Sequence, residues 1–557
     1  MRAEVDLQIT HPEGESENTA EITPQRWPLD TPGGRVYAEW NDDLPVTREG
    51  QLIFFFQFLN AGGRWSEFLA DTPLQYQGNQ GSGAHNVFGT LLLSVLRGHS
   101  RYAHINSVRG DGVNPSLLGM DKVVSEDTVR RGLLRIVNDE DDKKTEDEKD
   151  ENKGLDWLER HLVDSISPAL ILPWILDIDT TVKPIYGHQE GATVGYNPQK
   201  PGRPSHSYHS YFVGNLRLAL GVDIYPGNES ASANGLPGMW RMLDRLPRER
   251  WPTFVRGDCG YGSERVMVEC EERQLPYLFK LRRTAKVKNL VQTCLANSDG
   301  GIDTGDGWQA MEASLKLSGW TRKRRVVVVR EAPGSAPPKV KAEADAVADE
   351  SIPVKPKRGK KCKDQAPMLP GEDWQQEASP WSGKIAVLVT SLDTEYYPTV
   401  SMPRLYRERA DMENNYDELK NQWGWCGFTT KKLEVCQLAA TFIALVYNWW
   451  GLYVRFYDSE HHREAVTTRP YLMEGVGRQV QSGGQRTVKI SLTHEKGADV
   501  AEAVSLISRR LHEFMTIAEQ WTIYQRWAYL LTCVLRPWLG GKWLTGVPPD
   551  HQIHLTS

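Results

Sequence analysis

The chain has 557 residues, of which 39% are hydrophobic and 25% charged, and its net charge is −6. This length exceeds what one compact core holds and predicts several domains, and the composition excludes a disordered or fibrous protein. The seven cysteines include no C-x-x-C pair, which argues against a disulfide scaffold or a zinc site and favours the reducing cytoplasm.

The acidic excess is concentrated in one run. Residues 139–153 hold nine acids and four bases, a net of −5, and no apolar anchor, so we expect a solvated acidic linker there. The nearly neutral remainder permits local basic patches of the kind that bind phosphate. The most apolar stretch, residues 435–454, is interrupted by Gln437, Thr441 and Asn448. We therefore predict a buried helix and no association with a membrane.

Residues 1–138 are predicted to form a mostly helical, DNA-binding region. Apolar residues recur at helical spacing between 86 and 137, and Ser125 is a plausible N-cap of the last helix. Arg130, Arg131 and Arg135 add positive charge to that helix. Two interpretations are equally weighted: a helix-turn-helix that docks on DNA, or a helical bundle with solvated arginines.

After the linker, the spacing of the apolar residues changes and predicts strands alternating with helices, as in a mixed α/β sheet. Strands are expected at 169–178, 208–213, 216–224, 253–256 and 277–281, and helices at 236–246 and 264–272. A β-rich insertion at 282–399 follows, with strands at 325–330 and 385–390 and a basic low-complexity loop at 333–380. The remaining helices are expected at 403–423, 433–453 and 499–538. The catalytic core thus comprises 154–281 and 400–455, and a helical C-terminal region spans 456–557.

Two predicted strands end in carboxylates. Asp177 and Asp179 lie two residues apart, on one face of the first strand, and Asp258 follows a later strand between glycines. One strand-end acid alone is more typical of a capped turn. Two such acids in one sheet form the rigid oxygen frame that Mg²⁺ prefers.

The third pattern is Y-x2-R-x3-E-x6-K, formed by Tyr406, Arg409, Glu413 and Lys420. On a continuous helix these residues share one stripe, roughly 21 Å long. One acid among two bases and a tyrosine fits a track for phosphates beside a metal better than it fits a core face. Asp417 lies close to the same stripe and is the competing candidate for the acid's role.

Together, these three acids resemble the RNase H-like core of DDE transposases. The tyrosine, arginine, glutamate and lysine spacing is similar to the Y-R-E-K signature of the IS-four group of bacterial insertion-sequence transposases, and the β-rich insertion is also similar. The resemblance covers roughly residues 174–455. The choice of Asp179 over Asp177 rests on it, because the family's first acid is followed by threonine, as in Asp179-Thr180.

The resemblance implies a DNA transposase that binds terminal inverted repeats and cuts and joins strands with two Mg²⁺ ions, for which Mn²⁺ is expected to substitute. Asp179, Asp258 and Glu413 would be the metal ligands and catalytic residues. Tyr406, Arg409 and Lys420 would bind DNA. A homodimer acting on the bacterial nucleoid in the cytoplasm is the expected assembly.

Several alternatives stay open at this stage. An RNase H-like nuclease or resolvase would share the acids without strand transfer, and a domesticated protein would bind DNA without cutting. Lys200, Arg203, His206 and His209 form either a DNA-contacting hairpin tip or a solvated loop. Trp308 and Trp320 are candidates for base stacking. The apolar face at 506–538 either forms a dimer contact or packs on the protein's own core.

Overall fold

The computed structural model of the protein describes residues 27–32, 34–38, 44–76, 82–137, 153–197, 200–229, 231–297, 301–305, 307–332 and 384–548. The predicted low-complexity loop at 333–380 lies outside these residues. So does the predicted acidic linker, except for Lys153, which begins a helix.

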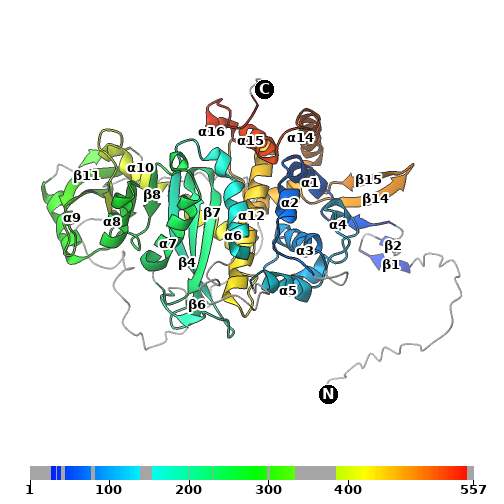
Figure 1. The fold of residues 1–557 in the computed structure, drawn as a ribbon, viewed down its shortest axis with the longest axis horizontal. Helices are drawn as coiled ribbons and strands as arrows, with labels where there is room; N and C mark the ends of the chain where they lie inside the picture. Colours follow the sequence, from blue (N-terminus) through cyan, green and yellow to red (C-terminus); the bar gives the residue numbers. More distant parts are fainter. Residues whose placement is uncertain are drawn as a thin grey trace, which may run out of the picture.

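The centre of the fold is a ten-stranded mixed sheet in the order β10-β11-β12-β13-β9-β8-β4-β6-β5, with β7 also paired to β6 (Figure 1). Within it, β7, β6 and β4 are antiparallel, whereas β4, β8 and β9 are parallel. This is the RNase H-like arrangement that the sequence predicted. The strands are β4 (Ile175–Pro184), β5 (Thr193–Val194), β6 (Pro204–Val213), β7 (Leu218–Pro226), β8 (Phe254–Gly257), β9 (Tyr277–Lys280), β10 (Ile302–Asp303), β11 (Trp308–Leu315), β12 (Arg324–Glu331) and β13 (Ile385–Thr390).

The insertion is β-rich, and its strands extend the sheet of the core. The β13 strand pairs antiparallel with β9, and β12 and β11 follow outward. Buried valines at 326–329 give β12 the continuous apolar run of a strand covered on both faces. The insertion therefore shares one hydrogen-bonded framework with the core, which ties its position to that of β9.

Helix α12 (Leu433–Tyr457) lies inside the molecule beside β7 and α6 (Figure 1). It is long and apolar enough to cross a membrane, but 94% of its apolar window is buried within the protein. The predicted buried helix is confirmed. Helices α1, α3, α5, α6, α14 and α15 contact it. The helices besides α12 are α1 (Leu52–Ala61), α2 (Arg64–Ala70), α3 (Ala84–Leu96), α4 (Asn114–Leu117), α5 (Glu126–Val137), α6 (Lys153–Asp164), α7 (Ala231–Asp244), α8 (Glu264–Glu272), α9 (Ala285–Asn297), α10 (Met402–Arg407), α11 (Ala410–Gln422), α13 (Ala465–Leu472), α14 (Gly497–Ile517), α15 (Ile523–Val534) and α16 (Arg536–Leu539).

Smaller elements join the two ends of the chain. The hairpin of β14 (Val476–Ser482) and β15 (Gln485–Ser491) pairs with β3 (Val46–Thr47), and β1 (Trp27–Thr31) pairs with β2 (Gly34–Ala38). One hydrophobic cluster runs from Leu52 to Leu544. The N-terminal and C-terminal regions thus form a common core around α12.

Some predicted boundaries were wrong. The strand expected at 169–178 begins only at Ile175, because Pro168 and Pro173 lack the N–H that a central strand donates. The helix expected at 403–423 is divided into α10 and α11. The helix expected at 499–538 becomes three helices, since a capping box at Thr522 and Gln525 starts α15 and Pro537 starts α16.

In the N-terminal region, the predicted cap of α5 is confirmed: the Thr128 backbone N–H donates to Ser125 Oγ at 3.3 Å. Helix α5 packs against α3, α6 and α12. Its Arg130 pairs with Glu126 and lies over the ring of Tyr102. These contacts are those of a helical bundle, and DNA binding by this region stays a prediction.

The apolar face of the C-terminal helices packs on the protein's own core. Leu511, Phe514, Trp527 and Leu530 are each at most 5% exposed, and α14 contacts α1 while α15 contacts α12. Part of the face is therefore occupied within one chain, whereas Leu506, Ile517 and Tyr524 are 43%, 50% and 39% exposed. A dimer contact through this region stays a prediction.

The fold predicts a large stability effect at Asn448. Its side chain accepts from the Ala219 N–H at 2.8 Å and donates to the Ala219 carbonyl at 2.7 Å, which joins α12 to β7. Asn448→Leu leaves both buried backbone groups without partners, at about 1–3 kcal/mol each. We expect a markedly lower melting temperature by calorimetry. The same substitution at the exposed Asn421 is the control, and equal melting temperatures for the two variants would contradict the prediction.

Candidate active site

Adjacent parallel strands bring the first two acids together. The register pairs Ile178 of β4 with Gly257 of β8, so Asp179 and Asp258 are the next residues along each strand. Gly262, just beyond, could not carry a side chain, because an added Cβ would meet the Lys280 carbonyl oxygen at 2.5 Å. The turn after β8 is therefore held tightly against β9. The prediction that the first strand ends at its acids was wrong, because β4 continues to Pro184 in its hairpin with β6. Asp179 instead lies where the parallel pairing with β8 ends, beside Asp258.

Both carboxylates are fixed by local hydrogen bonds. Asp179 Oδ1 accepts from the Thr180 backbone N–H at 2.7 Å, and Asp258 Oδ1 accepts from the Gly260 N–H at 2.8 Å. The second oxygen of Asp179 lies 2.5 Å from Nη2 of Arg409. The side chain of Asp179 is 15% exposed, so this arginine is its main counter-charge.

The carboxyl of Asp179 has an unusual electrostatic environment. Its pKa is raised to about 6, chiefly by burial and against the opposing effect of Arg409. The carboxylates of Asp258 and Glu413 contribute to the rise. A raised pKa with two acidic neighbours is characteristic of a site where negative charge is gathered for a function, at a cost in stability.

Asp177 has a different environment from Asp179. It is 1% exposed and forms a two-pronged pair with Arg256 of β8, with Nε–Oδ1 at 2.5 Å and Nη2–Oδ2 at 2.7 Å. Arg256 also donates through Nη1 to the Leu405 carbonyl of α10. Both oxygens of Asp177 are thus engaged in holding β4, β8 and α10 together, which favours Asp179 as the functional acid.

The four residues of the Y-R-E-K pattern do not lie on one straight helix. Tyr406 is on α10, Arg409 is at the junction before α11, and Glu413 and Lys420 are on α11. Arg409 is 8% exposed and faces Asp179, whereas Glu413 is exposed. Lys420 donates through Nζ to Thr181 Oγ1, two residues beyond Asp179 on β4. The pattern therefore clusters around Asp179, in place of the even stripe of a continuous helix.

Helix α11 is anchored on both sides. The Tyr416 hydroxyl is hydrogen-bonded to Ser210 Oγ of β6, and Ser210 is the cross-strand partner of Asp179. Glu418 is buried and accepts from the Trp423 indole at 3.1 Å, with His462 Nε2 2.7 Å from its other oxygen. These contacts hold Glu413 above the strand that carries the first acid.

Asp417, the competing acid, is exposed and accepts from Asn421 within its own helix at 2.7 Å. Glu413 is also exposed, and it is one of the acids that raise the pKa of Asp179. The choice of Glu413 over Asp417 as the functional acid of α11 stays a prediction.

Sequence reasoning missed the supporting residues Arg256, Tyr416 and Glu418. Arg256 had a signal, since an arginine inside an apolar strand requires a buried acid, and Asp177 was at hand. Tyr416 and Glu418 lie within the polar sequence of α11, and nothing local distinguishes them from solvated residues. Their partners, Ser210 and His462, are distant in sequence.

The structure distinguishes among the other residues considered for DNA contact or base stacking. His206 and His209 are fully buried in β6, so the hypothesis that they contact DNA at a hairpin tip was wrong. Trp320 is 7% exposed and covered by Arg324, which removes it as a base-stacking residue. Trp308 is partly exposed, and the Arg407 guanidinium lies 5.3 Å from its ring centroid.

Asp179, Asp258 and Glu413 are carboxylates, which are the ligands that hard divalent metal ions prefer. Among the described residues, no three acids, histidines or cysteines lie close enough to hold a metal ion. The Arg409 guanidinium also contacts one oxygen of Asp179. The fit to a metal therefore rests on the chemistry of the donors, and their role as ligands stays a prediction.

Comparison with known proteins points to one family. The family described as "Transposase DDE domain" matches residues 171–449, which is half of the chain and includes every acid discussed above. No curated protein matches at a significant level. Six solved chains match, among them one titled as the cryo-EM structure of a piggyBac transposase synaptic complex with hairpin DNA. That chain is 13% identical, with 92% of this chain and 95% of that chain covered and a TM-score of 0.36.

The site predicts that Arg256 is essential for stability. Arg256→Ala leaves the Asp177 carboxylate buried without a counter-charge, which costs about 3–5 kcal/mol. We expect a lower urea midpoint of unfolding, followed by circular dichroism.

The matched control is Arg265→Ala, which removes an arginine that is 60% exposed and paired with Glu269 on the surface of α8. Surface pairs contribute about 0–1 kcal/mol. Equal effects of the two substitutions would show that the buried pair does not hold these strands and α10 together.

Proposed function

The chain belongs to the transposase DDE domain family of enzymes that cleave and transfer DNA, and from this membership we propose that it is the transposase of a bacterial insertion sequence. It would bind the terminal inverted repeats of that sequence, cut them and join them to a target. The observation that supports this proposal is the pairing of β4 with β8, which sets Asp179 beside Asp258, together with the Arg409–Asp179 contact at the start of the helix that bears Glu413.

Divalent metal ions are general cofactors of this family, and we assign two Mg²⁺ ions, replaceable by Mn²⁺, to Asp179, Asp258 and Glu413. When bound, such ions supply positive charge to the attacking and leaving oxygens of an in-line phosphoryl displacement. The two aspartates sit on hydrogen-bonded strands and are fixed, whereas Glu413 comes from a helix. The protein's contribution is to hold three negative groups together despite their repulsion.

Arg409 reduces the electrostatic repulsion between these acids. Its buried guanidinium compensates Asp179, and burial lowers the pKa of Arg409 less than Asp179 and its neighbours raise it, so it remains charged. Beside a bound DNA strand, the same group is placed to stabilise phosphate charge. Tyr406, next to it, would position the strand. Lys420, close to Thr181, would hold a neighbouring phosphate.

Within the transposases, we propose that this chain belongs to the IS-four group. The proposal is based on the Y-R-E-K pattern formed by Tyr406, Arg409, Glu413 and Lys420. We also propose a homodimer bridged by DNA, because cutting two ends and joining them to one target needs two active sites. The proposed location is the cytoplasm, at the nucleoid.

The acids provide the first test. Asp179→Ala, Asp258→Ala and Glu413→Ala should each abolish cleavage and strand transfer of an end duplex in Mg²⁺, because each removes a metal ligand. Binding of the duplex in gel-shift assays should persist. Chelation of divalent ions should reproduce the loss in the wild-type protein, and added Mn²⁺ should restore activity.

Asp417→Ala is the matched control, since it removes an acid one turn away on the same helix. It should retain activity. An inactive Asp417→Ala protein beside an active Glu413→Ala protein would refute the assignment of the helix acid. Cleavage without strand transfer by the wild-type protein would instead identify a nuclease or resolvase.

Lys420 provides a second test. Lys420→Gln removes the charge while keeping much of the side-chain length, and it should reduce the steepness of log K against log salt for duplex binding by about 0.9. Fluorescence anisotropy at several salt concentrations measures this slope. Asn421→Gln, on the next position of α11, should leave it unchanged. Identical slopes for the Lys420→Gln protein and the wild type would show that Lys420 serves only to hold Thr181.

A further inference from the structure

The hairpin that carries Asp179 continues past the acids and ends in an exposed aromatic and cationic cluster, which we call the tip cluster: Tyr186, Lys200 and Arg203. Tyr186 is 67% exposed. The Lys200 ammonium lies 4.9 Å and the Arg203 guanidinium 4.5 Å from the centre of its ring. Lys200 also donates to the Tyr186 hydroxyl. The cation–π contacts hold both cations on one exposed ring.

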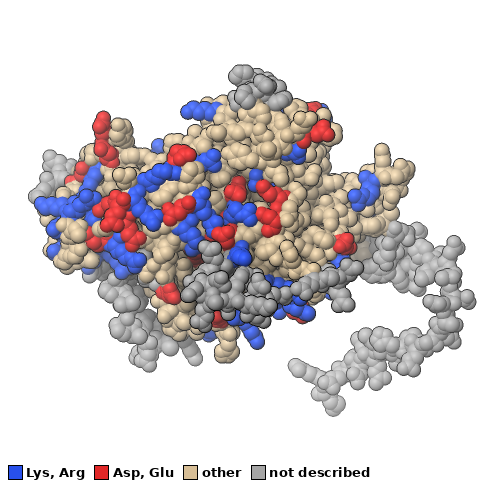
Figure 2. Space-filling model, viewed as in Figure 1, with Lys and Arg blue, Asp and Glu red and all other residues tan. Residues whose placement is uncertain are grey.

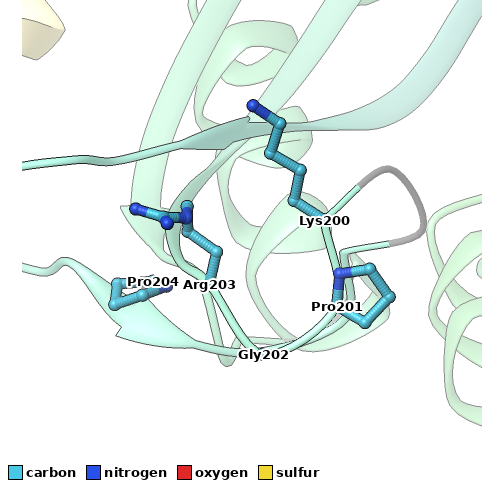
Figure 3. A pocket seen from close by; sticks show the side chains of 5 residues that line it. All are labelled: Lys200, Pro201, Gly202, Arg203 and Pro204. Carbon is cyan, nitrogen blue, oxygen red and sulfur yellow. The ribbon is translucent and has the colours of Figure 1, made fainter. Parts of the chain in front are cut away.

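The tip is a built structure. The Ile185 N–H donates to the Pro204 carbonyl at 2.8 Å, and the Lys200 N–H donates to Oδ1 of the buried Asn197 at 3.0 Å. Gly202 has a φ of +76°, which closes the turn before Arg203. Figure 3 shows the Lys200 and Arg203 side chains on the same side of the loop, above a hollow lined also by Pro201, Gly202 and Pro204.

The two cations of the tip cluster have no acidic partner in the part of the chain that the structure describes. Elsewhere, positive and negative side chains alternate over much of the face in Figure 2, where surface arginines pair with acids, as Arg245 does with Asp156 and Arg273 with Asp244. A mixed surface of that kind has little net attraction for polyanions. Two uncompensated cations stacked on one ring, in contrast, keep their N–H groups available to an external anion.

The position of the tip cluster specifies the anion. Tyr186 follows Asp179 by seven residues, so the two cannot be more than about 25 Å apart even if the chain between them is fully extended. Duplex DNA advances about 3.4 Å per base pair along each strand. A duplex with one phosphate at the acids would present further phosphates at the tip within about seven base pairs.

We infer that Tyr186, Lys200 and Arg203 form a second DNA-backbone contact, which holds the duplex within about seven base pairs of the phosphate being cut. The inference rests on the proposed function and adds a site to it. Lys200 and Arg203 bind phosphate oxygens, and Tyr186 keeps both cations in place. Such a contact fixes the register of the duplex relative to the acids without reading its sequence.

The double variant K200Q/R203Q tests this inference on the full-length protein. Binding to a random-sequence duplex of about 40 base pairs should lose about 1.8 from the slope of log K against log salt, because two phosphate contacts disappear. The melting temperature should not change, since both side chains lie outside the core.

The matched control is R486Q/K489Q, which removes the same two charges from exposed positions on the β14–β15 hairpin, beside the N-terminal helices (Figure 1). Its slope should equal that of the wild type. A wild-type slope in K200Q/R203Q, or an equal loss in both variants, overturns the inference. A wild-type protein that neither cleaves nor binds duplex DNA would overturn the proposed function as well, which separates the two failures.

A photo-crosslinking residue at position 186 locates the contact. With a duplex carrying the element's end and its flanking DNA, we expect crosslinks within about seven base pairs of the cleaved phosphate. Crosslinks on the element's side identify the terminal repeat as the source of the phosphates, and those on the other side identify flanking DNA. Crosslinks only at more distant positions, or none, would refute the assignment.

Discussion

The site depends on one constraint: a half-buried carboxylate beside two other acids requires a fixed positive charge. Arg409 supplies it to Asp179, at 2.5 Å. The arginine comes from the junction of α10 and α11, so the same contact attaches the helix that bears Glu413 to the strand that bears Asp179. The contact between Arg409 and Asp179 therefore both compensates the carboxylate and places the helix that carries the third acid. The buried Asp177–Arg256 pair is a second acid–arginine contact of this kind. Arg256 also donates to the Leu405 carbonyl, which attaches α10 to the same two strands.

The remainder of the fold keeps that junction in register. Parallel pairing of β4 and β8 sets Asp179 beside Asp258, and the Tyr416–Ser210 hydrogen bond holds α11 over β6 opposite the first acid. Glu418 ties the same helix to His462, beyond the central helix α12 in sequence. Three long-range contacts thus orient one short helix. Glu413 and Asp417 lie on the exposed part of this helix, and Glu413 contributes to the raised pKa of Asp179.

The sequence predicted the parts of this arrangement that are governed by local periodicity. Helix α8, strand β13 and the buried nature of α12 were confirmed. What it did not predict depends on distant partners. A continuous helix from 403 to 423 was the best local interpretation, since neither Glu408 nor Arg409 breaks a helix by propensity. The break is stabilised by tertiary contacts, in which Arg409 turns toward Asp179 and Arg256 binds the end of α10. The buried histidines of β6 were missed for the same reason.

The geometry also explains why basic residues near these acids differ in kind. Arg409 is buried, and it compensates the carboxylate of Asp179. Lys420 is half-buried and shares its ammonium with the hydroxyl of Thr181 and the ring of Tyr416. At the hairpin end, Lys200 and Arg203 rest on an exposed ring and face no described carboxylate. Compensation therefore decreases with distance from Asp179 along β4. A polyanion laid along this strand would meet increasingly uncompensated cations as it leaves the acids, which favours a duplex that runs outward toward the tip cluster.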